Sequence, residues 1–138
     1  MIDPVVIILP AFNAESTLGP VVKGLRQVLP NARIIGVNDG SADGTGALLR
    51  SVCDRTIEFS ENRGKGEALR VAFKAALETD CRAVLTIDSD GQHDPAFAPS
   101  ILEARFSSGL VCLTPTIVPP VMNVASPSTM MKTWLVFS

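Results

Sequence analysis

Four short apolar runs alternate with amphipathic segments along the chain, and this alternation constrains the fold more than any other feature of the sequence. The runs are VVIIL (5–9), RIIGVN (33–38), RTIEF (55–59) and RAVLTI (82–87). Short apolar runs of this kind, bounded by turn residues, are typical of the buried strands of a parallel sheet. The sequence therefore predicts four such strands.

The segments between these runs have the features of helices. We expect a first helix capped by Ser16 or Thr17 and running to about Leu29, and further helices over 43–52, 65–79 and 95–108. The segment 65–79 is the clearest, because its apolar residues recur with helical spacing. A fifth strand is expected over 110–114. Strands and helices in strict alternation predict an α/β fold, a parallel sheet with helices on both faces.

A polar loop follows each predicted strand. These loops are PAFNAES (10–16), DGSADG (39–44), SENRGKGE (60–67) and DSDGQHD (88–94). In an open α/β sheet, ligands bind at the carboxyl ends of the strands. Each loop taken alone is also ordinary turn and capping chemistry, but their occurrence together predicts one polar ligand site at one edge of the sheet.

The fourth loop has the donors of a divalent metal site. Asp88 and Asp90 are two residues apart, so an extended backbone places both side chains on the same side. Their carboxylates and the side-chain carbonyl of Gln92 are hard oxygen ligands, which suit Mg²⁺ or Mn²⁺. Such ions usually keep water ligands and bridge to substrate phosphates. The spacing therefore predicts a metal-bound phosphate ester as the ligand.

The third loop can supply the phosphate contacts. Arg63 and Lys65 flank Gly64, and Gly66 follows just inside the predicted helix. Cationic side chains and the positive end of a helix both favour a phosphate group. A P-loop is excluded because it requires glycine where Phe59 stands and serine or threonine at Gly66.

Composition excludes several other classes of protein. The net charge is −2 and no basic cluster occurs, which argues against nucleic-acid binding. The three cysteines, Cys53, Cys81 and Cys112, have no CxxC spacing, so neither a zinc site nor a disulfide framework is expected. No basic n-region precedes the first apolar run, and no apolar stretch is long enough for a membrane span. We therefore expect a cytoplasmic protein, or one peripheral at the inner face of the membrane.

Four motifs resemble the successive motifs of the family 2 glycosyltransferases. They are VVIILPAFNAESTLGPVV, IIGVNDGSADGT, ENRGKGEALRVAF and VLTIDSDGQHDP. They occur in the family's order and spacing, over about residues 4–106. The sequence is most similar to the branch that contains dolichyl-phosphate mannose synthase and other polyprenyl-phosphate glycosyltransferases.

The resemblance implies a GT-A fold, a Rossmann-like three-layer sandwich that binds a UDP- or GDP-linked sugar. It also implies transfer of the sugar to an acceptor such as a polyprenyl phosphate, with Mg²⁺ or Mn²⁺ as cofactor. Phe12 takes the place of the family's usual tyrosine, and Asn38 replaces the first acid of its Asp-Asp-Gly-Ser motif. The implied donor-binding residues are Pro10, Ala11, Phe12, Glu15, Asp39, Arg63, Lys65 and Asp88, and the implied metal ligands are Asp88, Asp90 and Gln92.

The composition changes after about residue 106. All 14 acidic residues lie at or before Glu103, and from residue 107 onward the only charged residue is Lys132. We therefore expect a donor-binding core over residues 1–106 and a divergent, apolar, proline-rich tail over 107–138 that is not an independent domain. The tail offers no carboxylate or imidazole base, so we assign no catalytic residue. We expect a form truncated on its acceptor side, with a homo-oligomer or a partner covering the apolar tail.

Two alternatives remain at this point. The chain is either a transferase or a catalytically inactive nucleotide-binding module, and donor binding alone does not separate these hypotheses. A phosphatase of the haloacid dehalogenase type also uses Asp-x-Asp after a strand. That class normally carries the motif on its first strand, with threonine where Gln92 stands, which disfavours it here.

Overall fold

The computed structural model describes residues 4–91, 94–100, 102 and 133–136, which form one parallel sheet with helices on both faces. The strands of the sheet lie in the order β3-β2-β1-β4-β5. Their bounds are β1 Val5–Ala11, β2 Arg33–Asp39, β3 Arg55–Phe59, β4 Ala83–Thr86 and β5 Thr133–Val136. The helices are α1 Glu15–Val28, α2 Thr45–Val52 and α3 Lys65–Leu77.

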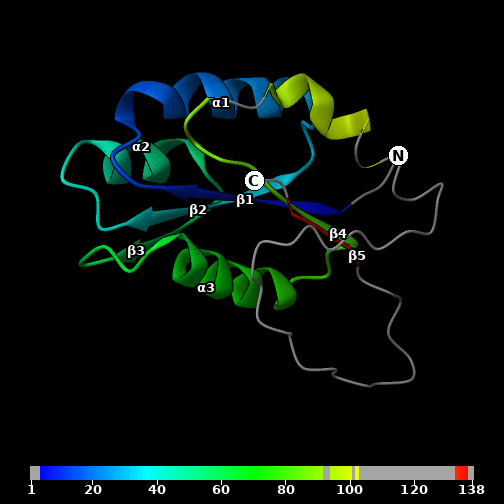
Figure 1. The fold of residues 1–138 in the computed structure, drawn as a ribbon. Coiled ribbons are helices and arrows are strands. Elements are labelled where there is room, and N and C mark those ends of the chain that lie inside the picture. Colours follow the sequence, from blue (N-terminus) through cyan, green and yellow to red (C-terminus); the bar gives the residue numbers. More distant parts are fainter. Residues whose placement is uncertain (1–3, 92–93, 101, 103–132, 137–138) are drawn as a thin grey trace.

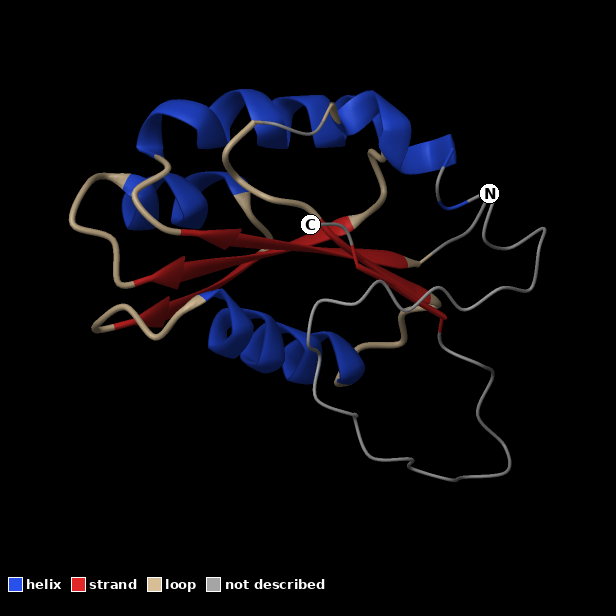
Figure 2. Ribbon diagram, in the orientation of Figure 1, coloured by secondary structure: helices blue, strands red, loops and turns tan. Residues whose placement is uncertain are grey.

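The helices form two layers around the sheet (Figures 1 and 2). α1 and α2 cover one face, together with a 3₁₀ turn at Pro95–Phe97 that continues as α-helix over 98–100. α3 covers the other face, where it contacts β1 and β2. The predicted three-layer α/β architecture is therefore confirmed.

Strand β1 is the centre of the hydrophobic core. Ile7 and Leu9 belong to the core on the α1 side, and Val6 and Ile8 belong to the core on the α3 side. All four side chains are at most 1% exposed. Burial of each such side chain contributes about 1.5–3 kcal/mol. Because successive side chains enter opposite layers, the strand is apolar at every position rather than at alternate ones.

The predicted elements agree with the structure except at three places. The fifth strand is β5 at Thr133–Val136, within the tail that the sequence analysis separates from the core, and it pairs in parallel with β4. The segment 110–114, where the sequence predicts that strand, lies outside the described residues. The same holds for all but Leu102 of the predicted helix beyond residue 100.

The second difference is at the N-terminus of α1. The third is in β1, which continues past Leu9, where the sequence predicts its end. α1 begins at Glu15 after Ala14, without a side-chain cap from Ser16 or Thr17. The amide of Ala14 donates instead to Oγ1 of Thr45, 31 residues away, at 2.9 Å. The side chain of Thr45, far away in the sequence, therefore accepts the amide of Ala14 beside the helix start, a donor for which local capping residues provide no partner.

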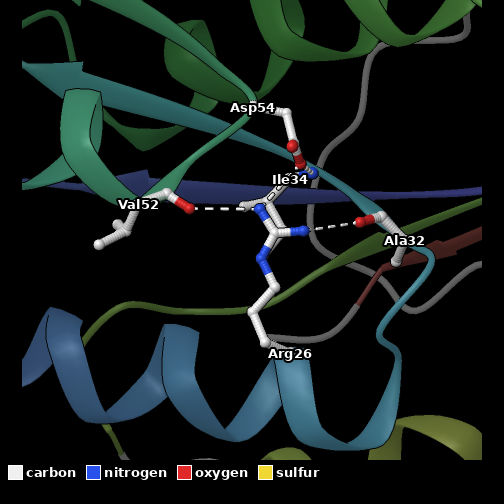
Figure 3. A network of polar contacts seen from close by, with 5 residues as sticks. All are labelled: Arg26, Ala32, Ile34, Val52 and Asp54. Carbon is white, nitrogen blue, oxygen red and sulfur yellow. Dashed lines mark hydrogen bonds and ion pairs between the residues drawn. The ribbon is translucent and has the colours of Figure 1, made fainter.

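Arg26 connects three chain segments at the edge of the sheet opposite the polar loops (Figure 3). Its guanidinium donates to the carbonyl oxygens of Ala32 and Val52, at 3.1 and 3.2 Å, and to Oδ2 of Asp54 at 2.9 Å. The same Asp54 oxygen accepts the amide N–H of Ile34 at 2.7 Å. α1, the start of β2 and the connection between α2 and β3 are thereby held together.

This network makes stability depend on pH. Partial burial raises the pKa of Asp54, but the hydrogen bonds from Ile34 and Arg26 outweigh it and hold the pKa below its ordinary value. A depressed folded-state pKa stabilises the protein above the unfolded-state pKa, and that stabilisation is lost as the pH falls through the folded-state pKa. We expect Asp54→Asn to cost about 1 kcal/mol at pH 7, a value reduced by solvent exposure of the pair, and much less at pH 2.5.

Urea unfolding at the two pH values measures this difference. Asp80→Asn, which removes one exposed carboxylate from the connection between α3 and β4, is the matched control. A cost of Asp54→Asn that is the same at both pH values would contradict the assignment.

The cysteines of the described residues are not candidates for catalysis. Cys53 and Cys81 are free thiols. Burial raises the pKa of the Cys53 thiol to about 11, so the thiol stays protonated and is a poor nucleophile. No helix in the described part of the chain combines the length and the apolar character needed to cross a bilayer.

Candidate functional site

A cleft with a volume of about 340 Å³ opens at the carboxyl ends of the strands. It lies beside the topological switch point of the sheet, because the chain leaves β1 toward β2 on one side and β4 lies on the other. Ligands of open α/β sheets bind at such points. The cleft is lined by Pro10, Ala11, Phe12, Asp39, Asn62, Gly64, Lys65, Ala68, Asp88, Ser89 and Asp90.

Pro10 marks the place where β1 and β4 separate. The sequence predicts that β1 ends before Pro10, but the strand continues through Ala11 and pairs with β2. The carbonyl of Ile8 accepts the amide of Ile87, so Ile8 faces β4, and by alternation Pro10 faces β4 as well. Pro10 has no N–H to continue that ladder. The chain after Ile87 can therefore leave the sheet and form a wall of the cleft.

The first and second loops hold each other through reciprocal hydrogen bonds. The amide of Asn13 donates to Oγ of Ser41, and the Asn13 side-chain oxygen accepts the amide of Ala42, both at 2.9 Å. Oε2 of Glu15 accepts the amide of Gly44 at 3.1 Å. Asn13 has a φ of 48°, which asparagine tolerates better than most residues. The two loops therefore form one unit.

Asp43 is a further part of this unit. The hydroxyl and the amide of Thr45 both donate to its carboxylate, and the amide of Glu15 does so at 3.3 Å. The hydrogen bond from the Thr45 hydroxyl is the main cause that lowers the pKa of Asp43. Asp43 thus remains a carboxylate acceptor between the starts of α1 and α2.

Asp39 fixes the third loop. Its Oδ1 accepts the amide of Arg63 at 2.7 Å and its Oδ2 accepts the amide of Gly64 at 3.0 Å. Only 4% of Asp39 is exposed. A carboxylate beside a helix N-terminus is favourable both for the free amides and for the helix dipole. Asp39 therefore sets the position from which α3 begins.

The fourth loop contacts the third loop and helix α1, which follows the first loop. Nζ of Lys65 lies 2.6 Å from Oδ1 of Asp88. The hydroxyl of Thr17 donates to the carbonyl of Ser89 at 2.6 Å. Loop one thus contacts loop two, loop two contacts loop three, loop three contacts loop four, and loop four returns to α1. We call this closed set of contacts the loop ring.

Comparison with known proteins identifies the family. The family model for glycosyl transferase family 2 matches residues 6–132, almost the whole chain. The chain belongs to glycosyl transferase family 2. The match extends beyond residue 106, where the sequence analysis places the end of the resemblance, and the predicted family and GT-A fold class are both confirmed.

Individual relatives cover this chain well but are longer. The undecaprenyl-phosphate mannosyltransferase of Micrococcus luteus is 31% identical over 78% of this chain and 46% of its own length. The polyprenol monophosphomannose synthase of Mycolicibacterium smegmatis is 30% identical over 71% of this chain and 39% of its own length. The chain therefore spans less than half the length of these curated relatives.

A solved glycosyltransferase structure has the same fold. Glucosyl-3-phosphoglycerate synthase from Mycobacterium tuberculosis, in complex with Mn²⁺, UDP and glucosyl-3-phosphoglycerate, superimposes with a TM-score of 0.57 at 26% identity. The alignment covers 72% of this chain and 38% of the synthase. That neighbour binds UDP, a nucleotide diphosphate, and Mn²⁺, a divalent metal.

The structure brings most of the expected family 2 site residues to one cleft. Seven of them line it: Pro10, Ala11, Phe12, Asp39, Lys65, Asp88 and Asp90. Glu15 is not among the lining residues, since its carboxylate holds Gly44. The Arg63 guanidinium lies 4.9 Å from the centroid of the Phe59 ring, and Arg63 is not a lining residue either. Gln92 lies outside the described residues.

Sequence reasoning missed three lining residues: Asn62, Ala68 and Ser89. The side-chain amide of Asn62 donates to the carbonyl of Asp39 at 3.3 Å. Asn62 could have been found, because it belongs to the polar loop that follows β3. Ala68 belongs to the apolar stripe of α3, so nothing in the sequence indicated that it lines the cleft.

The departure at Asn38 from the usual family 2 acid has a local reason. Asn38 lies directly opposite Glu58 in the pairing of β2 with β3. A carboxylate at that position would place like charges across the ladder, which is destabilising. The Asn38 side-chain oxygen accepts the amide of Ser41 at 3.0 Å. The amide side chain thus retains the turn contact without adding a charge.

The described residues fit a divalent metal, although they do not supply all of its ligands. Asp88 and Asp90 line the same cleft, and their carboxylates are the donors that Mg²⁺ and Mn²⁺ prefer. Among the residues that the structure describes, no group of three histidine, cysteine, aspartate or glutamate side chains gathers into a metal site. A two-carboxylate site suits an ion that completes its shell with water and phosphate oxygens. The cation on Asp88 in this structure is the Lys65 ammonium.

Proposed function

We propose that this chain is the donor-binding part of a metal-dependent glycosyltransferase. Its donor would be a UDP- or GDP-linked sugar, and its acceptor a polyprenyl phosphate. One observation carries the proposal: Asp88 and Asp90 face the same cleft as Lys65 and the N-terminus of α3. Acidic metal ligands beside a cationic, anion-binding helix end are what a metal–diphosphate complex requires.

Each wall of the cleft would have its own task. Pro10, Ala11 and Phe12 present apolar surface for the base and ribose, and Phe12 is 51% exposed and free to stack. Lys65 and the amides at the start of α3 would bind the diphosphate. Asp88 and Asp90 would hold the metal, with Gln92 as a third ligand. The bound ion would neutralise charge on the leaving nucleotide diphosphate as a Lewis acid.

The acceptor assignment is supported by the relatives, whose names specify undecaprenyl phosphate and polyprenol monophosphomannose. A phosphate acceptor is already anionic at neutral pH, so attack on the anomeric carbon does not require a protein base. The lack of acidic residues and histidine after Glu103 is therefore compatible with transfer.

Thermal unfolding with nucleotides tests donor binding. At a ligand concentration of about 100 Kd, we expect UDP or GDP with Mn²⁺ to raise Tm by roughly 5–10 °C. Asp90→Asn should remove the Mn²⁺-dependent part of that rise, because a carbonyl and an amide replace a charged ligand. Asp80→Asn is the matched control, since it removes an exposed carboxylate far from the cleft.

The outcomes separate the hypotheses. If neither UDP nor GDP raises the Tm of the unmodified chain, donor binding is refuted. A rise without transfer of sugar to a polyprenyl phosphate would show a nucleotide-binding module instead of a transferase.

A further inference from the structure

Lys65 occupies a position that is electrostatically unusual. It is the first residue of α3, where the helix dipole disfavours a cation. Its ammonium nevertheless lies 2.6 Å from Oδ1 of Asp88, and the Asp88 side chain is only 22% exposed. The charge of Asp88 therefore offsets the unfavourable position of Lys65 at the helix start.

The other cation of the same loop is engaged elsewhere. The Arg63 guanidinium lies over the Phe59 ring, and the backbone amide of Arg63 donates to Asp39. Asp39 also binds the amide of Gly64, so the backbone immediately before Lys65 is fixed. The Lys65 side chain can move from this fixed point, because it is 48% exposed and has a flexible four-carbon stem.

We propose that Lys65 is a resident counter-cation that exchanges its partner when metal and nucleotide bind. Without metal, its ammonium neutralises Asp88. A divalent ion that binds Asp88 takes over that carboxylate and repels the ammonium, which then binds the diphosphate in the same cleft. Lys65 therefore competes with the metal alone and cooperates with the metal–nucleotide complex. The proposal goes beyond the donor-binding function proposed above and rests on it.

The replacement Lys65→Met tests this exchange, because it keeps most of the stem and removes the charge. We expect the variant to bind Mn²⁺ alone about three- to tenfold more tightly than the unmodified chain, since one competitor is removed. In saturating Mn²⁺, it should bind UDP or GDP about tenfold more weakly. The first affinity is measured from the electron paramagnetic resonance of free Mn²⁺, and the second by calorimetry.

The opposite signs of the two changes are diagnostic. A purely structural role of Lys65 would weaken both affinities, and a role in phosphate binding alone would leave the Mn²⁺ affinity unchanged. Either result overturns the proposal. Lys74→Met, on an exposed position of the same helix, is the matched control and should change neither affinity.

The test also separates this inference from the proposed function. If the unmodified chain binds Mn²⁺ and nucleotide but Lys65→Met does not bind Mn²⁺ more tightly, the exchange is refuted and the donor site stands. If neither protein binds Mn²⁺, whether alone or together with UDP or GDP, both proposals fail. If Lys65→Met binds Mn²⁺ that the unmodified chain excludes, the competition is confirmed.

Discussion

Replacing Asp39 with alanine should lower the free energy of unfolding by about 2–4 kcal/mol. The substitution removes the acceptor of two amide hydrogen bonds, from Arg63 and Gly64, at a residue that is 4% exposed. A fully buried donor left without a partner costs about 1–3 kcal/mol, and these two part-buried amides should each cost a value at the low end of that range. Loss of this carboxylate also removes a favourable anion from the N-terminus of α3. Urea unfolding at pH 7 measures the change.

Two further variants distinguish this role from a general loss of charge. Asp39→Asn keeps one acceptor oxygen and should cost about half as much as Asp39→Ala. Glu61→Ala removes an exposed acid from the same part of the molecule and should be nearly neutral. If Asp39→Ala unfolds at the same urea concentration as the unmodified chain, the third loop is not held by Asp39.

Replacing Gly40 with alanine should be still more disruptive, costing at least about 3 kcal/mol. Gly40 has a φ of +69°, and a Cβ there would lie 2.3 Å from the carbonyl carbon of Glu61 and 2.4 Å from the amide nitrogen of Asn62. The backbone conformation alone costs about 1–2 kcal/mol for a residue with a side chain. Both contacts are with backbone atoms, so the loops themselves must separate.

Gly19→Ala is the matched control for this prediction. Gly19 lies inside α1, and a Cβ there meets nothing within 4 Å. The same substitution should change the stability by less than about 1 kcal/mol, because helix propensity favours alanine while a Cβ directly before Pro20 disfavours the helical backbone. Thermal unfolding of both variants should show a large loss at Gly40 and only a small change at Gly19. A Gly40→Ala variant as stable as Gly19→Ala would contradict the close approach of the second and third loops.

Most of the fold follows from the order of apolar runs, because a strand buried on both faces leaves an unmistakable pattern. β2, which is largely buried, lies within one residue of its predicted bounds, and the edge strand β3, which is only partly buried, lies at its predicted bounds. The pattern fails at Pro10, because a proline normally indicates the end of a strand. Here the position that lacks an N–H faces β4, and the chain of β4 leaves the sheet at this point. It also fails for β5, which is four residues long and is set in the sheet by pairing with β4 rather than by local sequence.

The location of the site was more predictable than the task of each residue. Polar loops after parallel strands must converge, so Asp39, Lys65, Asp88 and Asp90 could be placed together from the sequence. The contacts of Glu15 and Asp39 could not be predicted from the sequence, because both carboxylates bind backbone amides of loops 20–30 residues away. Sequence spacing gives no information about which of several nearby acids is taken up in this way.

The loop ring has a consequence for the exchange of loops between this chain and a homologue. Exchanging a single loop for that of a homologue would leave its neighbours facing the wrong partners, since Asn13 is matched to Ser41 and Ala42, and Asp39 to Arg63 and Gly64. Adjoining loops should therefore be transferred together, and grafts should be designed as matched pairs.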